Sequence, residues 1–246
     1  MPTAADLKAF ASANMPEDDA SASGGAIDTA TLIEFTPLAA NDSLEMVSDN
    51  AGDAGNATLT GRQPSGAIAA ETAALNGTTV VPFNTLGTIE RLMKFVLAAA
   101  AAGSVTLRRA GGGATVAVLA AGITAVRRMF YDSASEASAT TRYEKIFLKN
   151  THATETLNNA AVKLTADPSA SIRIGVAGAK DDTGSVANRK TAPGGVTFVD
   201  DNVSQAVPTS ALAAGEAIGV WVELQRGAGA AAIKDSFTVE LSGTSV

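Results

Sequence analysis

The residues best suited to chemistry in this chain are carboxylates on turns. Three pairs lie close together in the sequence: Asp49 and Asp53, Asp181 and Asp182, and Asp200 and Asp201. Paired acids hydrolyse glycosides when a sugar-binding cleft holds them a few ångströms apart, and oxygen ligands on turns suit calcium. These acids lie among Gly, Ser and Asn, and the segment 49–53 lacks the EF-hand pattern. We therefore expect solvated turns without a metal or other cofactor, with calcium binding as the alternative.

His152 is the only histidine, and the chain has no cysteine. A Ser-His-Asp triad would have to use His152, but Ser and Asp are too common here for their presence to be informative. A zinc site is disfavoured because one His and no Cys leave only carboxylates as further ligands. We expect a loop histidine at the end of a strand over 144–149, no catalytic residue and no enzymatic activity.

Three consecutive glycines, at 111–113, lack the Lys-Ser/Thr that follows the glycines of a phosphate-binding P-loop, so they predict a hairpin loop. Two arginine pairs flank this loop in the sequence, Arg108 with Arg109 and Arg127 with Arg128. In an acidic protein they could form a small basic patch that binds an acidic surface on another copy. The alternative is that they are the solvated ends of two strands.

Trp221 lies in an alternating segment, 218–224, whose aliphatic residues occupy one face. Side chains alternate across a strand, so Trp221 falls on the opposite face together with Glu223 and Gln225. A tryptophan on a polar face is either covered by a loop, which we expect, or part of a contact surface, where tryptophan is enriched.

The composition describes an acidic protein whose core has small side chains. The chain has 246 residues, 46% of them apolar, but only 8 Phe, 2 Tyr and 1 Trp. Small side chains bury little area each, which favours further burial between subunits. The formal net charge of −7 argues against nucleic acid as a partner, because affinity there comes from Lys and Arg, and against a basic membrane-binding surface. We expect neither a secretory signal nor a membrane segment.

The elements that would position these residues are short strands separated by turns. In the clearest of them, 236–242, Phe237, Val239 and Leu241 share one face. Turn signals about every 8–12 residues are typical of sandwiches and barrels. The expected strands lie at 33–35, 44–47, 58–60, 67–75 and 105–107, and then at 144–149, 162–165, 172–176, 196–199, 218–224 and 237–241.

This spacing predicts an all-β protein with two tandem β-sandwich domains, at 26–132 and 142–246. The small, polar segment 133–141 is expected to link them. Residues 1–25 are polar and turn-prone, so we expect an extended N-terminal arm, either disordered or ordered against a neighbouring subunit.

The segment 89–102 is ambiguous. Ile89, Leu92 and Met93 follow helical spacing, and the neighbouring hairpins favour a strand. We expect a strand, because a lone helix would leave the sheet one strand short.

Several segments spread along most of the chain resemble the virion structural proteins of tailed bacteriophages. These segments are 12–19 with 24–27, 59–62 with 75–78, 145–151, 215–221, and 235–238 ahead of Gly243. None of them is a catalytic signature. The resemblance implies a non-enzymatic subunit of a phage particle, built of immunoglobulin-like β domains, present in many copies and assembled in the host bacterial cytoplasm.

The resemblance also implies the partners: other copies of the chain and neighbouring virion proteins, in a symmetric homo-oligomeric assembly. A tail or baseplate component is favoured, a head decoration (cement) protein is the first alternative, and a carbohydrate- or receptor-binding β-sandwich module is the second. The residues that we expect at contacts are Met15, Glu17, Asp18, Asp19, Arg108, Arg109, Arg127, Arg128 and Trp221.

Overall fold

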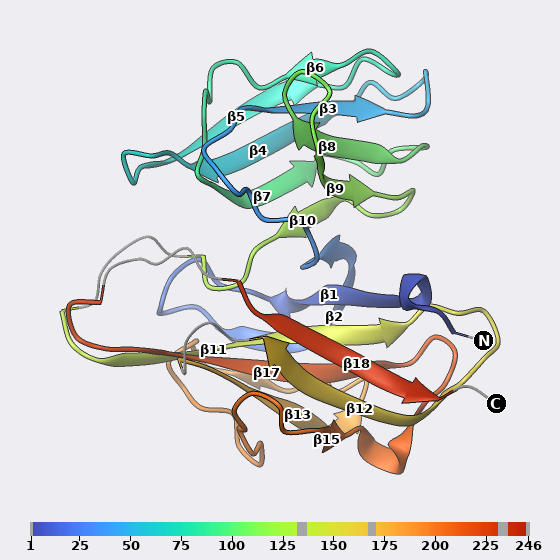
Figure 1. The fold of residues 1–246 in the computed structure, drawn as a ribbon, viewed down its shortest axis with the longest axis vertical. Helices are drawn as coiled ribbons and strands as arrows, with labels where there is room; N and C mark the ends of the chain where they lie inside the picture. The colour runs from blue at the N-terminus through green and yellow to red at the C-terminus, as the bar shows by residue number, and fades with distance from the viewer. Residues whose placement is uncertain (1, 132–136, 167–170, 231–235, 245–246) are drawn as a thin grey trace. The chain divides into compact units, whose positions relative to one another are not determined.

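The computed structural model describes residues 2–131, 137–166, 171–230 and 236–244. These residues form eighteen strands and two 3₁₀ helices, η1 (Ala4–Asp6) and η2 (Pro208–Ser210), so the all-β prediction is confirmed (Figure 1). The chain divides into two compact units. We call Met1–Asp28 with Met129–Val246 the terminal unit and Thr29–Arg128 the inserted unit.

The terminal unit contains two sheets. The larger has the strand order β13 (Ile172–Lys180), β17 (Ala217–Arg226), β11 (Thr140–Asn150), β1 (Leu7–Asn14) and β2 (Ser23–Leu32), with β14 (Ser185–Val186) paired to β2. The smaller is built on β12 (Leu157–Ala166), which pairs with β15 (Gln205–Ala206), β16 (Ala211–Leu212) and β18 (Thr238–Thr244). Alternate residues of β12, including Val162 and Leu164, are fully buried, as are Ile174 on β13 and Val220 on β17.

The inserted unit also contains two sheets. One has the order β2, β10 (Ala125–Arg127), β7 (Arg91–Leu97), β4 (Asn56–Arg62) and β5 (Ile68–Ala74), and the last residues of β2 supply its first strand. The other has the order β6 (Val81–Pro82), β3 (Leu44–Ser48), β8 (Val105–Arg109) and β9 (Thr115–Leu119). One buried apolar cluster joins them, in which Phe83 meets Phe95 edge to face with ring centroids 6.1 Å apart.

The N-terminal segment is part of the terminal unit's sheet, which differs from the arm expected at 1–25. β1 pairs antiparallel with β11, so that Phe10 lies opposite Phe147 and Ala11 opposite Ile146. Phe10 and Ala11 are buried. A strand with a partner on each side gains hydrogen bonds along both edges, so it can be stable with few large side chains. The low apolar content of residues 1–25 was therefore a misleading reason to expect an arm.

The order of the units also differs from the tandem arrangement expected from the sequence. Both ends of the chain belong to the terminal unit, and the inserted unit lies between them in the sequence. Of the linker expected at 133–141, residues 133–136 lie outside the described residues, and Thr140 begins β11. Strand periodicity reports which residues share a face, but it does not report which strands pair.

Within the ambiguous segment 89–102, Arg91–Leu97 forms the strand β7, which pairs antiparallel with β4 on one side and β10 on the other, whereas 98–102 is not a strand. Most of the other expected strands are present, but 33–35 is not a strand, and 196–199 contributes only an isolated bridge between Val199 and Ile174. No helix in the described part of the chain is long and apolar enough to cross a membrane.

Candidate functional site

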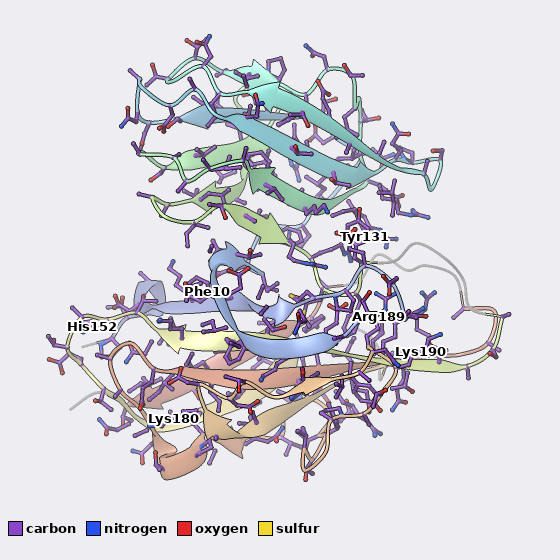
Figure 2. All side chains as sticks on the ribbon, turned by 180° about the vertical axis from the view of Figure 1, so that it is seen from behind. Phe10, Tyr131, His152, Lys180, Arg189 and Lys190 are labelled. Carbon is purple, nitrogen blue, oxygen red and sulfur yellow. The ribbon has the colours of Figure 1, made fainter. Side chains whose placement is uncertain are left out.

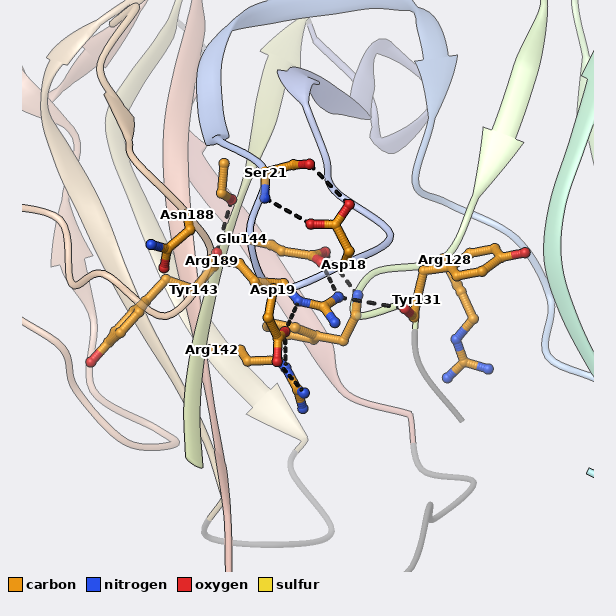
Figure 3. A network of polar contacts seen from close by, with 12 residues as sticks. Asp18, Asp19, Ser21, Arg128, Tyr131, Arg142, Tyr143, Glu144, Asn188 and Arg189 are labelled. Carbon is orange, nitrogen blue, oxygen red and sulfur yellow. Dashed lines mark hydrogen bonds and ion pairs between the residues drawn. The ribbon is translucent and has the colours of Figure 1, made fainter. Parts of the chain in front are cut away.

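The densest group of charges in the terminal unit gathers around Asp19, in the turn between β1 and β2 (Figure 3). Its carboxylate accepts two hydrogen bonds from Arg142, at 2.8 and 2.9 Å, in the side-on geometry that suits a guanidinium. Arg189 Nε lies 2.5 Å and Lys190 Nζ 2.6 Å from the same carboxylate. The hydrogen bond from Arg142, which outweighs the opposing effect of burial, holds the pKa of Asp19 far below its usual range.

The residues around Asp19 fix the same turn. Asp18 accepts hydrogen bonds from the backbone N–H groups of Ala20 and Ser21, each at 2.7 Å. These bonds lower the pKa of Asp18, with the bond from Ser21 contributing most. Met15 is buried, whereas Glu17 and Asp18 are exposed. Of the four contact residues expected here, the structure therefore leaves Glu17 and Asp18 on the surface, and it places Asp19 inside an ion-pair cluster.

Arg189 connects this cluster to a buried acid, Glu144. Glu144 is fully buried on β11, and it accepts a 2.8 Å hydrogen bond from the backbone N–H of Phe130. Arg189 Nη1 lies 3.8 Å from Glu144 and donates to the carbonyl of Tyr131 at 3.4 Å. Figure 2 shows Arg189, Lys190 and Tyr131 on one side of the terminal unit. The cluster ties together three segments that are far apart in the sequence.

A second buried cation, Lys145, lies on the other face of β11. Its ammonium group donates to the carbonyls of Gly25 (3.1 Å), Asp182 (2.8 Å) and Gly184 (3.2 Å), and to the Asp182 carboxylate (2.5 Å). Burial lowers the pKa of Lys145, and the ion pair with Asp182 opposes that effect. Burial raises the pKa of Asp182, but the bonds from Lys145 and Gly184 outweigh it, so the net shift is downward. The ammonium group therefore holds Gly25 of β2 and the turn 182–184 against β11.

Trp221 is 3% exposed, so it is covered within the chain and is not an exposed contact residue, but strand β2 lies on it where we expected a loop. The ammonium of Lys145 lies 5.7 Å from its ring centroid. A Cβ atom at Gly24 would lie 2.6 Å from the indole, and Gly24 has φ +97°. Glycine at this position therefore lets the backbone of β2 lie directly on Trp221.

The two arginine pairs of the inserted unit belong to different sheets. Arg108 binds Glu45 at 2.8 Å, and Arg109 lies 3.5 Å from Asp42. Arg127 is on β10, in the other sheet, and Arg128 follows it. Glu45 also accepts the N–H groups of Gly111 and Gly112, each at 2.9 Å. These glycines lie between β8 and β9, so the predicted hairpin loop is confirmed, and Glu45 holds it closed.

Asp49 and Asp53, expected on a solvated turn, both bind the turn at 102–104, far away in the sequence, and Asp53 is buried. Asp53 accepts hydrogen bonds from Ser48 Oγ (2.6 Å) and from the N–H groups of Ala102 (2.9 Å) and Gly103 (3.1 Å). Asp49 accepts the N–H of Ser104 at 2.7 Å. In the ranges that the structure describes, no three His, Asp or Glu side chains are grouped as metal ligands.

His152 lies in the loop after β11 (Figure 2). The imidazole Nδ1 accepts hydrogen bonds from the backbone N–H groups of Thr154 (3.2 Å) and Glu155 (3.0 Å). The backbone N–H of His152 donates to Asn150 Oδ1 at 3.1 Å. The imidazole therefore closes a turn.

Sequence reasoning missed the buried charges of Arg142, Glu144, Lys145 and Arg189. A signal for the first three was present, since they directly precede the apolar run Ile146–Leu148 in the same strand. A buried charge is expensive without a partner, so charges inside such a strand predict partners. The pattern does not identify those partners, because they lie in distant turns.

No family model, no curated protein and no solved structure matches this chain.

Proposed function

We propose that this protein is a non-enzymatic structural subunit of a tailed-bacteriophage particle, built of immunoglobulin-like β domains and acting through contacts with other copies and with neighbouring virion proteins. The observation that carries the proposal is that charged side chains fix turns and loops within each unit. Asp19, Glu45, Asp53 and Lys145 each bind turns or loops of their own unit. Loops fixed in this way offer neighbours a surface of defined shape, and preorganisation lowers the entropic cost of each contact.

The segments that resemble phage virion proteins support the same proposal, as does the small-residue composition, which favours burial between subunits. The exposed acids Glu17 and Asp18 remain our proposed contact residues in the first turn of the terminal unit. We place the subunit in the virion, assembled in the host cytoplasm, with no catalytic role.

Within the particle, we favour a tail or baseplate position over a head decoration position. The two are separated by particles that lack the protein, which are heated and then examined for DNA release. A tail or baseplate subunit predicts full heads that retain DNA but do not infect. Heads that leak DNA on heating would instead identify a cement protein.

The proposal as a whole is tested by antibody labelling of purified particles in negative-stain images. We expect label at repeated positions on each particle. Particles without label, together with saturable binding of the purified protein on a glycan array, would replace the proposal with a carbohydrate-binding module.

A further inference from the structure

We propose that residues 191–198 form a flap that opens and uncovers Tyr143 while the rest of the terminal unit stays folded. The flap belongs to the long connection 187–204, between β14 and β15, in which the only strand-like pairing among the described residues is an isolated bridge from Val199 to Ile174. Connections longer than about 12–15 residues without secondary structure of their own are usually functional or disordered. The inference goes beyond the proposed function and does not rest on it.

The chain is fixed just before the flap. Arg189 is 2% exposed, and its Nε lies 2.5 Å from the carboxylate of Asp19 (Figure 3). The carbonyl of Arg189 accepts the backbone N–H of Tyr143 at 2.6 Å, and Lys190 Nζ lies 2.6 Å from Asp19. These contacts hold residues 189 and 190 against β11, so the flap begins after Lys190.

The chain is fixed again just after the flap, by backbone pairing. Val199 donates to the carbonyl of Ile174 at 2.9 Å, and Ile174 donates to that of Val199 at 3.1 Å. A pair of residues that exchanges both hydrogen bonds is the unit of an antiparallel ladder. Since Ile174 is fully buried on β13, this pair anchors the far end of the flap to the sheet.

Between these two ends, two side chains hold the flap in place. Phe198 packs on Tyr143, with ring centroids 5.4 Å apart, and Val196 lies against Gly175, where an added Cβ atom would overlap it. Phe198 and Val196 are both half-buried. Within the described part of the chain, no hydrogen bond joins residues 192–198 to the sheet. The other exposed residues of the flap are Thr191, Ala192, Gly194, Gly195 and Thr197.

Such a segment can open at a lower cost than the unit needs to unfold. Local opening is cheapest where buried apolar contacts are few and the backbone is not hydrogen-bonded to the core. Opening the flap breaks the contacts of Val196 and Phe198 and leaves the ion pairs of Asp19 intact. Gly194 and Gly195, in the middle of the flap, give the open chain additional conformational freedom.

Tyr143 is the side chain that the flap covers. It is 9% exposed and lies on β11, directly opposite Glu223 of β17. Burial, and then the charge of Glu223 and the hydrogen bond to it, raise the pKa of the Tyr143 phenol. When the flap opens, the Tyr143 ring loses its contact with Phe198 and meets water. The reactivity of Tyr143 toward a reagent in solution therefore measures opening.

The test is nitration of the full chain by tetranitromethane in increasing, sub-denaturing urea, with the rate at Tyr143 followed by peptide mass spectrometry. We expect Tyr143 to react in the folded protein with a urea dependence much shallower than that of global unfolding, because the slope scales with the surface exposed. Tyr131, the only other tyrosine, is the internal reference.

Two neighbouring glycines provide matched variants with opposite expected effects. Gly194 has no positive φ and no atom near an added Cβ, so Gly194→Ala should lower the entropy of the open flap and slow nitration of Tyr143 about two- to fivefold. Gly195 has φ +71°, so Gly195→Ala should strain the closed flap and speed nitration at least about twofold. Phe198→Ala removes the contact with Tyr143 and should speed nitration about tenfold.

The rate at Tyr131 should be the same in all three variants. The proposal is overturned if Tyr143 reacts only with the full urea dependence of global unfolding, or does not react in the folded protein. It is also overturned if the two glycine variants shift the rate in the same direction or leave it unchanged. If Phe198→Ala does not fold, the two glycine variants decide the question.

Discussion

Asp19 and Lys145 are single charged residues that each hold several segments of the terminal unit in place. Asp19 meets three cations, and Lys145 meets three carbonyls and a carboxylate. Removing one partner of a buried ion pair is costly, because the other partner stays buried without compensation. Substitutions of Asp19 or Lys145 should therefore lower the free energy of unfolding.

Lys145→Met should destabilise the protein by about 3 kcal/mol, because the carbonyls of Gly25 and Gly184 lose their donor and Asp182 loses its cation. The measurement is urea unfolding followed by tryptophan fluorescence. Lys149→Met, four residues along the same strand at a half-buried position, is the control and should change stability by less than about 1 kcal/mol. Equal effects of the two variants would contradict the role given to Lys145.

The pH dependence of stability should report on Asp19. Its pKa is lowered in the folded state, first by Arg142, so its contribution is complete above the unfolded pKa of about 3.9 and is lost as pH falls toward the folded pKa. Wild-type stability should therefore fall more steeply below about pH 4 than that of Asp19→Asn, which cannot titrate there. Urea unfolding at pH 7, 4 and 3 measures the difference. Parallel pH profiles would contradict the prediction.

At the scale of elements, β11 is the strand that organises the terminal unit. Side chains alternate across it, so Arg142 and Glu144 point to one face and Lys145 to the other, and each face carries a buried charge cluster. The hairpin β8–β9 is held in a similar way by Glu45, which binds its loop from the neighbouring strand β3.

Glu45→Gln should loosen the loop between β8 and β9. A neutral amide is a weaker acceptor than a carboxylate for the N–H groups of Gly111 and Gly112 and for Arg108, so we expect a loss of about 1–2 kcal/mol. Amide hydrogen exchange at the two glycines should become faster. Glu240→Gln, on the exposed face of β18, is the matched control and should leave their exchange unchanged.

At the scale of the whole molecule, the inserted unit has its own core between its two sheets. The boundary between the two units falls within β2. Thr31 and Leu32, the two residues of β2 that pair with β10, belong to the inserted unit.

A chain of Thr29–Arg128 should therefore fold alone, since domains near 100 residues bury enough surface to be stable. Circular dichroism should show a β spectrum with a cooperative thermal transition. A coil spectrum would show that this unit needs the terminal unit in order to fold.

The sequence by itself determined the all-β class, most of the strands, the glycine hairpin and the loop position of His152, because period-two alternation and turn residues act locally. Tertiary structure decided the rest. It placed β1 beside β11, covered Trp221 with β2, and brought Asp19 to Arg142 and Asp182 to Lys145. Strand pairing and the satisfaction of buried charge join distant residues, 37 positions apart for Lys145 and Asp182 and 123 for Asp19 and Arg142. No local pattern records which distant turn supplies the partner.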